Sequence, residues 1–288
     1  MGSLIISGVK TRKETGGAPQ VGSYTGEYTV DENGWIRFLT SGELRVKNTA
    51  VIDAFLVGGG GAAASHIRSG TSSSVYKYAS PGGGGGYTLT KRAFTLYPHK
   101  KYSIVIGAGG KYYQANSSTA KDGGRGGTTS AFGVSAEGGY GGRLPKPSEP
   151  SEERITKGGD GGSGGGAVGG AKMVDGVTLL YVYAGGVDGA DGGGTETEIG
   201  GTGQGRTTRA FEDVGGELFA SGGDGGYWVA LSPEKAGNPL AGAANTGDGG
   251  DGDCSWSYYD SQKVQRYSYR NGKSGGSGVV IIRKAVEG

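Results

Sequence analysis

Compact apolar segments separated by glycine-rich stretches make up most of this chain. Four of these segments cover Val51–Val57, Tyr102–Ile106, Val177–Tyr183 and Val279–Ile282. The first and the last are continuously apolar rather than alternating, a pattern typical of strands covered on both faces. The pattern therefore predicts an all-β protein with a β-sandwich or jelly-roll-like core, and it leaves the pairing order of the strands open.

A hairpin is predicted near the start of the chain. Glu27–Val30 and Trp35–Leu39 flank Asp31–Gly34, and the Asn-Gly pair in this connection is a strong hairpin signal. Ser41 and Gly42 predict the next turn, which leads into a strand at Glu43–Val46.

The chain divides into two parts by composition. Residues 1–23 are of mixed character, contain the linker Gly16–Pro19, and form an N-terminal arm that is either an attachment segment or a ragged terminus. Residues 24–288 form one glycine-rich domain, in which short strands alternate with glycine tracts.

Glycine supplies 67 of the 288 residues, about three times its usual share of roughly 7%. In regular structure it costs about 0.5–1 kcal/mol relative to alanine. The tracts are therefore either flexible coil or use packing that only glycine permits. Because the interleaved apolar segments need burial, the sequence favours an ordered domain.

Many tracts read Gly-Gly-X-Gly-Gly, as at Gly123–Gly127, Gly138–Gly142 and Gly222–Gly226. A period of three matches a polyproline-II-type helix, whose backbone N–H and C=O groups point outward. Such helices can bond to one another if side chains do not separate them. Collagen needs abundant proline, and the chain has only 8. The tracts therefore predict a packed layer of polyglycine II helices that closes over part of the core, with X on one edge.

Several motifs occur in an order that resembles phage tail glycine-rich domains. They are Ala54–Gly61, Gly82–Tyr87, Tyr102–Gly110, Gly123–Phe132 and Gly275–Arg283. The glycine packing also looks similar to that of the extracellular glycine-rich domain of anaplastic lymphoma kinase, from which this chain departs by lacking its disulfides and signal sequence.

The phage resemblance covers roughly residues 24–284 and implies a tail-fibre or tail-tip protein of the virion. Such adhesins expose loops on stacked polyglycine helices and use them to touch host surface receptors. Their loops vary, so the identity of the receptor does not carry over.

Charge and cysteine content narrow the classes of function. The net charge of +2 gives no electrostatic case for nucleic acid or for an anionic membrane. No apolar run approaches the ~20 residues of a membrane span, and the first residues do not resemble a signal peptide. The lone Cys254 excludes an intramolecular disulfide framework. We expect a chain synthesised in the host cytoplasm, with no cofactor and no metal site.

Three motifs imitate catalytic or ligand sites. Leu56–Ala63 and Ile104–Gly110 resemble the turn of a dinucleotide-binding strand, but no helical period follows them. Gly161–Gly165 matches the Gly-x-Ser-x-Gly nucleophile elbow without the strand and helix that the elbow needs. The chain is therefore not expected to be an enzyme. Four aspartates inside glycine tracts lack the calcium-repeat spacing and are interpreted as solvated edge residues: Asp160, Asp224, Asp248 and Asp251.

Aromatic segments between glycine tracts are the stronger functional candidates. Cys254–Arg270 carries one Trp and four Tyr among Ser, Gln and Arg, a composition typical of recognition loops. The alternative is a β-hairpin whose aromatics cap the core or form a subunit interface. Secondary candidates are His66–Tyr78, Lys111–Asn116 and Tyr227–Leu231. The predicted receptor-binding residues are Trp256, Tyr258, Tyr259, Arg266, Tyr267, Tyr269, Tyr227, Trp228, Tyr112 and Tyr113.

The expected function is adhesion of a phage tail to a host-surface glycan or outer protein. The alternative is a purely structural protein of the virion or surface assembly that has no receptor contact. A self-assembling or ice-binding face would need regularly repeated small residues, whereas the X positions vary. Expected partners are the receptor, other tail proteins and further copies of the chain, with a homotrimer favoured.

Overall fold

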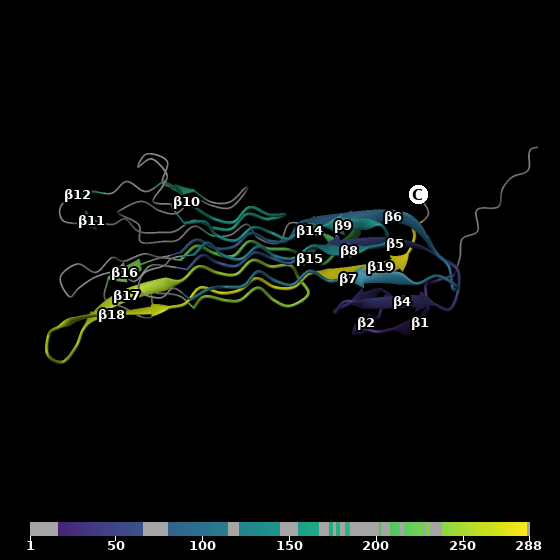
Figure 1. The fold of residues 1–288 in the computed structure, drawn as a ribbon, viewed down its shortest axis with the longest axis horizontal. Coiled ribbons are helices and arrows are strands. Elements are labelled where there is room, and N and C mark those ends of the chain that lie inside the picture. The colour runs from purple at the N-terminus through teal and green to yellow at the C-terminus, as the bar shows by residue number, and fades with distance from the viewer. Residues whose placement is uncertain are drawn as a thin grey trace, which may run out of the picture.

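The structure is a computed structural model that describes residues 17–65, 80–114, 121–144, 155–166, 173–174, 177–178, 182–184, 202, 208–213, 216–226, 228–230 and 238–286. Within these residues the protein is all-β, as predicted, and the single helical element is a short 3-10 turn, η2 (Ala210–Glu212). The molecule is elongated (Figure 1), with a two-sheet sandwich at one end, a bundle of extended glycine segments in the middle and a small sheet at the far end.

The sandwich consists of two five-stranded sheets with orders β1-β4-β7-β8-β9 and β2-β3-β19-β5-β6. Every strand pair in both sheets is antiparallel. Their bounds are β1 (Val21–Tyr24), β2 (Tyr28–Val30), β3 (Ile36–Phe38), β4 (Gly42–Val46), β5 (Ala50–Val57), β6 (Thr88–Leu96), β7 (Tyr102–Val105), β8 (Thr129–Ala131), β9 (Val134–Ala136) and β19 (Val279–Lys284).

Smaller sheets lie outside the sandwich. The pairs β10–β13, β11–β12 and β14–β15 each form a two-stranded sheet, and β16, β17 and β18 form a three-stranded one. Their bounds are β10 (Ile155–Lys157), β11 (Met173–Val174), β12 (Val177–Thr178), β13 (Val182–Ala184), β14 (Thr208–Arg209), β15 (Leu218–Phe219), β16 (Trp228–Ala230), β17 (Cys254–Tyr259) and β18 (Gln265–Arg270).

The hairpin predicted near the start is confirmed, as β2 and β3. The carboxylate of Asp31 accepts hydrogen bonds from the backbone N–H groups of Asn33 (2.9 Å) and Trp35 (3.0 Å). Gly34 takes a φ of +73°, which lets the chain reverse without the strain that a side chain would bring. The N-terminal arm of residues 1–23 falls mostly outside the described residues, and β1 at its end pairs with β4.

The two sheets of the sandwich enclose the main hydrophobic core. One face of β5 contributes Ile52, Ala54 and Leu56, all fully buried. They pack in one cluster with Phe38 from β3, Leu44 from β4 and residues of β6, β7, β8, β9 and β19. Alternate residues of β5 therefore face the main core, and these make up about half of its apolar residues.

The other half faces a second, smaller core. Phe55 and Val57 of β5 and Ile281 of β19 lie on the outer face of their sheet, where Phe211 and Phe219 cover them. The rings of Phe55 and Phe219 are 5.5 Å apart. The prediction that β5 and β19 are covered on both faces is confirmed, and the cover consists of η2 and β15.

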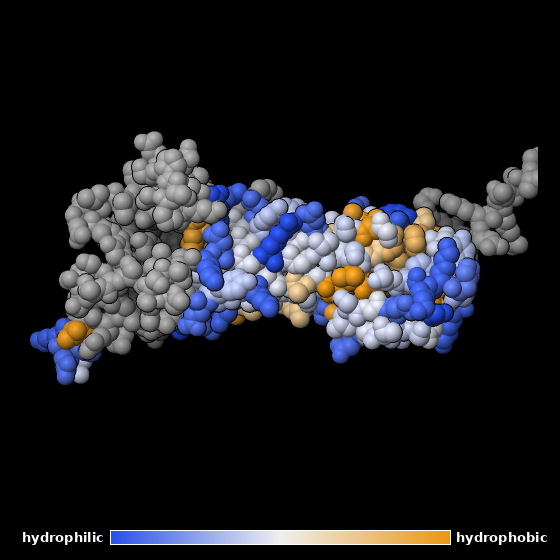
Figure 2. Space-filling view, viewed as in Figure 1, coloured by the Kyte–Doolittle hydropathy of each residue, from blue (hydrophilic) through white to orange (hydrophobic). Residues whose placement is uncertain are grey.

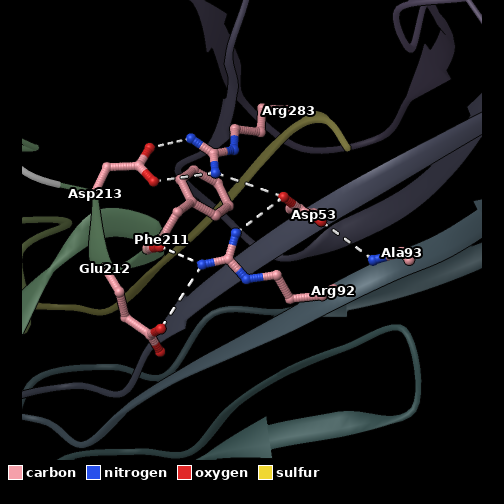
Figure 3. Close-up of polar contacts among 7 residues, drawn as sticks. All are labelled: Asp53, Arg92, Ala93, Phe211, Glu212, Asp213 and Arg283. Atoms are coloured by element: carbon pink, nitrogen blue, oxygen red, sulfur yellow. Dashed lines mark hydrogen bonds and ion pairs between the residues drawn. The ribbon is translucent and has the colours of Figure 1, made fainter. Parts of the chain in front are cut away.

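A buried carboxylate stands inside this second layer (Figure 3). Asp53 is 1% exposed, and it accepts a hydrogen bond from the backbone N–H of Ala93 at 3.1 Å. The pairing of β5 with β6 shifts at this position, and Ala93 has a φ of +53°, as in a β-bulge. Arg92 and Arg283 lie 3.3 and 3.5 Å from the same carboxylate, so its charge is compensated.

The two arginines also fasten η2 to the sheet (Figure 3). Arg283 forms an ion pair with Asp213, and its guanidinium lies 4.2 Å from the ring centre of Phe211. Arg92 donates to the backbone carbonyl of Phe211 and lies 3.7 Å from Glu212. Charge pairing therefore holds the cover of the second core in place alongside its aromatic packing.

The glycine tracts form a packed polyglycine array, as predicted, but the array extends lengthwise from the sandwich (Figure 1) instead of closing over part of the core. Residues 58–65 run through it, and their N–H groups donate in rotation to three neighbouring segments, 80–87, 121–127 and 272–278. The direction repeats every third residue, as a polyproline-II-type helix requires. The eight donor–acceptor pairs are Gly58–Tyr87, Gly59–Gly127, Gly60–Gly276, Gly61–Gly84, Ala62–Gly124, Ala63–Lys273, Ala64–Pro81 and Ser65–Lys121.

The carbonyls of the same segment accept from three further neighbours. The donors are Gly139 and Gly142 in segment 137–142, Gly110 in segment 107–111, and Gly250 in segment 247–253. Residues 58–65 are therefore surrounded by six segments, three reached through N–H groups and three through C=O groups. Such mutual bonding satisfies backbone groups that would otherwise be buried without partners.

Glycine is required here because neighbouring backbones nearly touch. A Cβ atom on any of Gly58 to Gly61 would lie 2.0–2.1 Å from a carbonyl oxygen of an adjacent segment. The third position of each repeat instead points outward, as predicted. In segments 122–128 and 137–143 the exposed residues recur every three positions, at Asp122, Arg125, Thr128, Glu137, Tyr140 and Arg143.

The pairing of strands in the sandwich continues into the glycine bundle. β5 and β6 are paired up to Val57, and the next residue, Gly58, donates to the carbonyl of Tyr87 immediately before β6. β7 and β8 continue in the same way, since Gly127 donates to Ala108 in the register of the strands. The strands thus leave the sheets and become glycine helices without a change of register.

We predict that Gly84→Val lowers the free energy of unfolding by several kcal/mol, the scale of overpacking combined with lost backbone hydrogen bonds. The ideal Cβ would lie 2.4 Å from the carbonyl oxygen of Asp160. Gly17→Val is the control, since its Cβ would meet only Asn48, at an ordinary 3.6 Å. Equal denaturant midpoints for the two variants would contradict dense packing of the bundle.

Candidate functional site

The predicted aromatic segment forms an antiparallel hairpin, β17–β18, at the end of the molecule opposite the sandwich (Figure 1). Six residue pairs join the two strands without a break in register, and β16 lies parallel to the other side of β17. The segment is therefore a regular extension of the fold instead of an irregular loop.

Asp260 organises the turn of the hairpin. Its N–H donates to the carbonyl of Val264 (3.0 Å), its carbonyl accepts from Lys263 (2.9 Å), and its carboxylate accepts from the N–H groups of Gln262 and Val264 (both 2.9 Å). Lys263 adopts a φ of +57°. Aspartate at the start of a turn is a known sequence signal, so this residue could have been singled out from the sequence.

The tip itself is open to solvent. Residues 261–264 are exposed, and Val264 is 45% exposed. Figure 2 shows the tip projecting at the far end as hydrophilic residues around a small hydrophobic patch.

The glycine bundle continues directly into the hairpin. Segment 247–253 leads into β17, β18 leads into segment 272–278, and the two segments are themselves paired. Gly276 donates to Asp248 and Lys273 donates to Asp251, in the register of β17 and β18. The bundle therefore positions both strands of the hairpin.

The register separates the predicted receptor-binding residues into two sets. Residues opposite each other in an antiparallel pair share a face, and successive residues alternate between faces. The first face holds Trp256, Tyr258 and Arg266. The second face holds Tyr259, Tyr267 and Tyr269. The sequence had grouped these residues without this division.

The remaining candidates lie apart from one another. Trp228 is in β16, opposite Ser255 of β17. Tyr112 is half-buried beside Gly272, just after β18, where a glycine Cβ would lie 2.9 Å from its ring, and Tyr113 is 44% exposed. Tyr227 and the secondary candidate His66–Tyr78 lie outside the described residues.

Two of the aspartates in the glycine tracts accept backbone hydrogen bonds with their carboxylates. The carboxylate of Asp248 accepts the N–H of Ser221 (2.9 Å), and that of Asp251 accepts the N–H groups of Asp224 (2.9 Å) and Leu240 (2.8 Å). Asp248 is only 6% exposed. The interpretation of Asp248 as a solvated residue was wrong, because its carboxylate is buried and accepts a backbone N–H. Asp251 is half-buried, and its carboxylate accepts two backbone N–H groups.

Burial raises the pKa of Asp251 above its ordinary value. The hydrogen bonds from Leu240 and Asp224 oppose this effect, and the negative charge of Asp224 adds to it.

The other motifs singled out from the sequence belong to the bundle. Ser163, the serine of the elbow-like motif, is fully buried in a glycine segment, and its carbonyl accepts the N–H of Gly85. Within the described residues, no group of three or more His, Cys, Asp or Glu is placed to hold a metal ion. No helix in the described part of the chain is long and apolar enough to cross a membrane.

The fold and its glycine packing define a class of protein. Residues 40–285 match the family model described as a glycine-rich domain, and the chain belongs to this family. No curated protein matches the chain.

We predict that the stability Asp251 contributes falls as pH rises through the range just above 3.8, its ordinary pKa. A carboxyl whose pKa is raised on folding binds its proton more tightly in the folded state, so the folded state loses stability as the group ionises. The wild type should therefore lose unfolding free energy relative to Asp251→Asn as pH rises. A constant difference from pH 3 to 7 would contradict the raised pKa.

We predict that Asp260→Ala loosens the hairpin tip without unfolding the protein. The variant loses the acceptor of the Gln262 and Val264 N–H groups, so amide hydrogen exchange at these positions should accelerate at least tenfold. Ser261→Ala is the control, and the melting temperature should stay within about 2 °C for both variants. Unchanged exchange at Gln262 and Val264 would show that the carboxylate does not order the turn.

Proposed function

We propose that this chain is an adhesive component of a bacteriophage tail fibre or tail tip that recognises a host-surface receptor through its far-end hairpin. The observation that carries the proposal is the separation of the two ends. The sandwich and the C-terminal residues lie at one end, and β17–β18 lies at the other (Figure 1). This arrangement suits a protein that is held at one end and makes contact at the other.

The glycine bundle supports the proposal as a rigid spacer. Its segments are bonded to neighbours in several directions, and two of them continue into the hairpin in the same register. A preorganised binding element loses less conformational entropy when it binds. A spacer of this kind therefore favours recognition by a fixed surface.

The residues of the hairpin support recognition in a second way. Tyrosine and tryptophan supply large amphipathic contact area with few rotatable bonds, and arginine adds hydrogen-bond donors. Such residues dominate the energetics of binding interfaces. The hairpin concentrates them next to an exposed tip.

The alternative is a structural protein of the virion whose hairpin contacts only other assembly proteins. It is distinguished from adhesion by whether the purified chain binds cells. The homotrimer expected from the sequence stays a prediction, because the structure holds one chain.

We predict that alanine substitutions on one face of the hairpin abolish binding to host cells. One variant combines Trp256→Ala, Tyr258→Ala and Arg266→Ala, and the other combines Tyr259→Ala, Tyr267→Ala and Tyr269→Ala. Anchoring residues often contribute ~2 kcal/mol each, so the variant of the contacting face should bind at least tenfold more weakly. Binding of the labelled, purified chain to a panel of bacterial strains is measured by flow cytometry.

Tyr97→Ala serves as the control, since it removes a 39% exposed aromatic residue that follows β6 in the sandwich. Far-UV circular dichroism and the melting temperature should be unchanged in all three variants. Full binding by both hairpin variants would place the site elsewhere. Unfolding of either variant would instead make its residues part of a core or interface, and binding to no strain would favour the structural alternative.

A further inference from the structure

The outer edge of β18 has a defined pattern of backbone groups. In the three-stranded sheet β16-β17-β18, β18 pairs with β17 on one side, and no described strand lies on its other side. The phase of the hairpin follows from its turn, because the N–H of Asp260 donates to Val264 and makes these two residues a hydrogen-bonded pair.

Antiparallel pairs alternate between hydrogen-bonded and non-hydrogen-bonded types. Counting from Asp260 and Val264 along the unbroken register, Ser268 exchanges bonds with Trp256, whereas Tyr267 stands in a non-hydrogen-bonded pair with Ser257. The N–H and C=O groups that point away from β17 therefore belong to Gln265, Tyr267 and Tyr269.

Within the described residues, the edge of β18 has neither a proline nor a bulge, and its charged residues are two arginines. Natural edge strands are protected by charged side chains, proline, a bulge, short length or a covering segment. β18 is six residues long, with the sequence Gln-Arg-Tyr-Ser-Tyr-Arg, and its pairing has no register shift. A regular edge beside an exposed tip, with no described strand on its outer side, is suited to binding another strand.

We propose that the outer edge of β18 binds an extended segment of a host-surface protein by adding it as a further strand of the sheet. The inference rests on the proposed function and names its receptor class, a protein instead of a glycan. The chemistry of the edge specifies the partner, because alternating N–H and C=O groups are matched by an extended peptide backbone.

Charge narrows the partner further. Arg266 and Arg270 lie four residues apart and share the first face of the hairpin. A partner strand with acidic residues four positions apart would place them beside these arginines, and opposite charges on neighbouring strands stabilise the pair. A second copy of β18 would instead gather four arginines on one face, so the edge disfavours self-association.

The test uses the full-length chain and an array of 12-residue peptides that tile the extracellular loops of bacterial outer-membrane proteins. We expect binding to peptides with carboxylates four residues apart. N-methylation at every second residue of the bound peptide should abolish binding, whereas N-methylation at the residues between them should leave binding unchanged. Absence of any bound peptide, or equal effects at all positions, would overturn the proposal.

A matched pair of variants tests the edge from the other side. Tyr267→Pro removes an outward N–H while leaving the bonds to β17 intact, because an edge strand tolerates proline where its N–H faces outward. Tyr267→Ala removes only the side chain. We expect Tyr267→Pro to weaken peptide binding at least tenfold more than Tyr267→Ala, and equal losses would overturn the proposal.

The integrity of the hairpin is checked by NMR, through the contact between the Hα protons of residues 257 and 267. If Tyr267→Pro loses this contact, the proposal is tested by the N-methylation pattern of the peptide bound to the wild type. Binding to cells without binding to peptides would support the proposed function and overturn strand addition at β18. Binding to peptides without binding to cells would support strand addition and overturn the proposed function. Concentration-dependent dimers that Tyr267→Pro abolishes would identify a second copy as the occupant and overturn the proposal.

Discussion

Direct hydrogen bonding between glycine backbones is the interaction on which the rest of this structure depends. Residues 58–65 have backbone neighbours on six sides, and this spacing leaves no room for a Cβ at Gly58 to Gly61. The cost of ordering so much glycine is offset because buried N–H and C=O groups find partners in every direction. The bundle therefore does without the hydrophobic core that other folds need along their length.

Glycine residues have no side chains with which to specify a register. The sandwich supplies it, because burial of alternate residues in β5, β6, β7 and β8 fixes how those strands pair. The same pairing then continues through the glycine segments. Burial in the hydrophobic core therefore sets the alignment of the glycine segments that continue these strands.

Much of this could be predicted from local sequence. The Asn33–Gly34 turn, the double burial of Val51–Val57 and the period-three glycine packing each depend on neighbouring residues. The cover of the second core by Phe211 could not be predicted, because about 150 residues separate it from Phe55. The role of Asp248 was also missed, since the backbone N–H that its carboxylate accepts belongs to Ser221, in a different glycine tract.

The candidate site shows the same limit and the reason for it. Composition alone selected Trp256, Tyr259 and Tyr267 as one group, yet the register puts the first on the opposite face from the other two. Faces are a property of pairing, and the pairing of β17 with β18 is shared by the glycine segments on either side of the hairpin. Because the register continues from segments 247–253 and 272–278 into β17 and β18, the same alignment decides which aromatic residues act together and which backbone groups of β18 point outward.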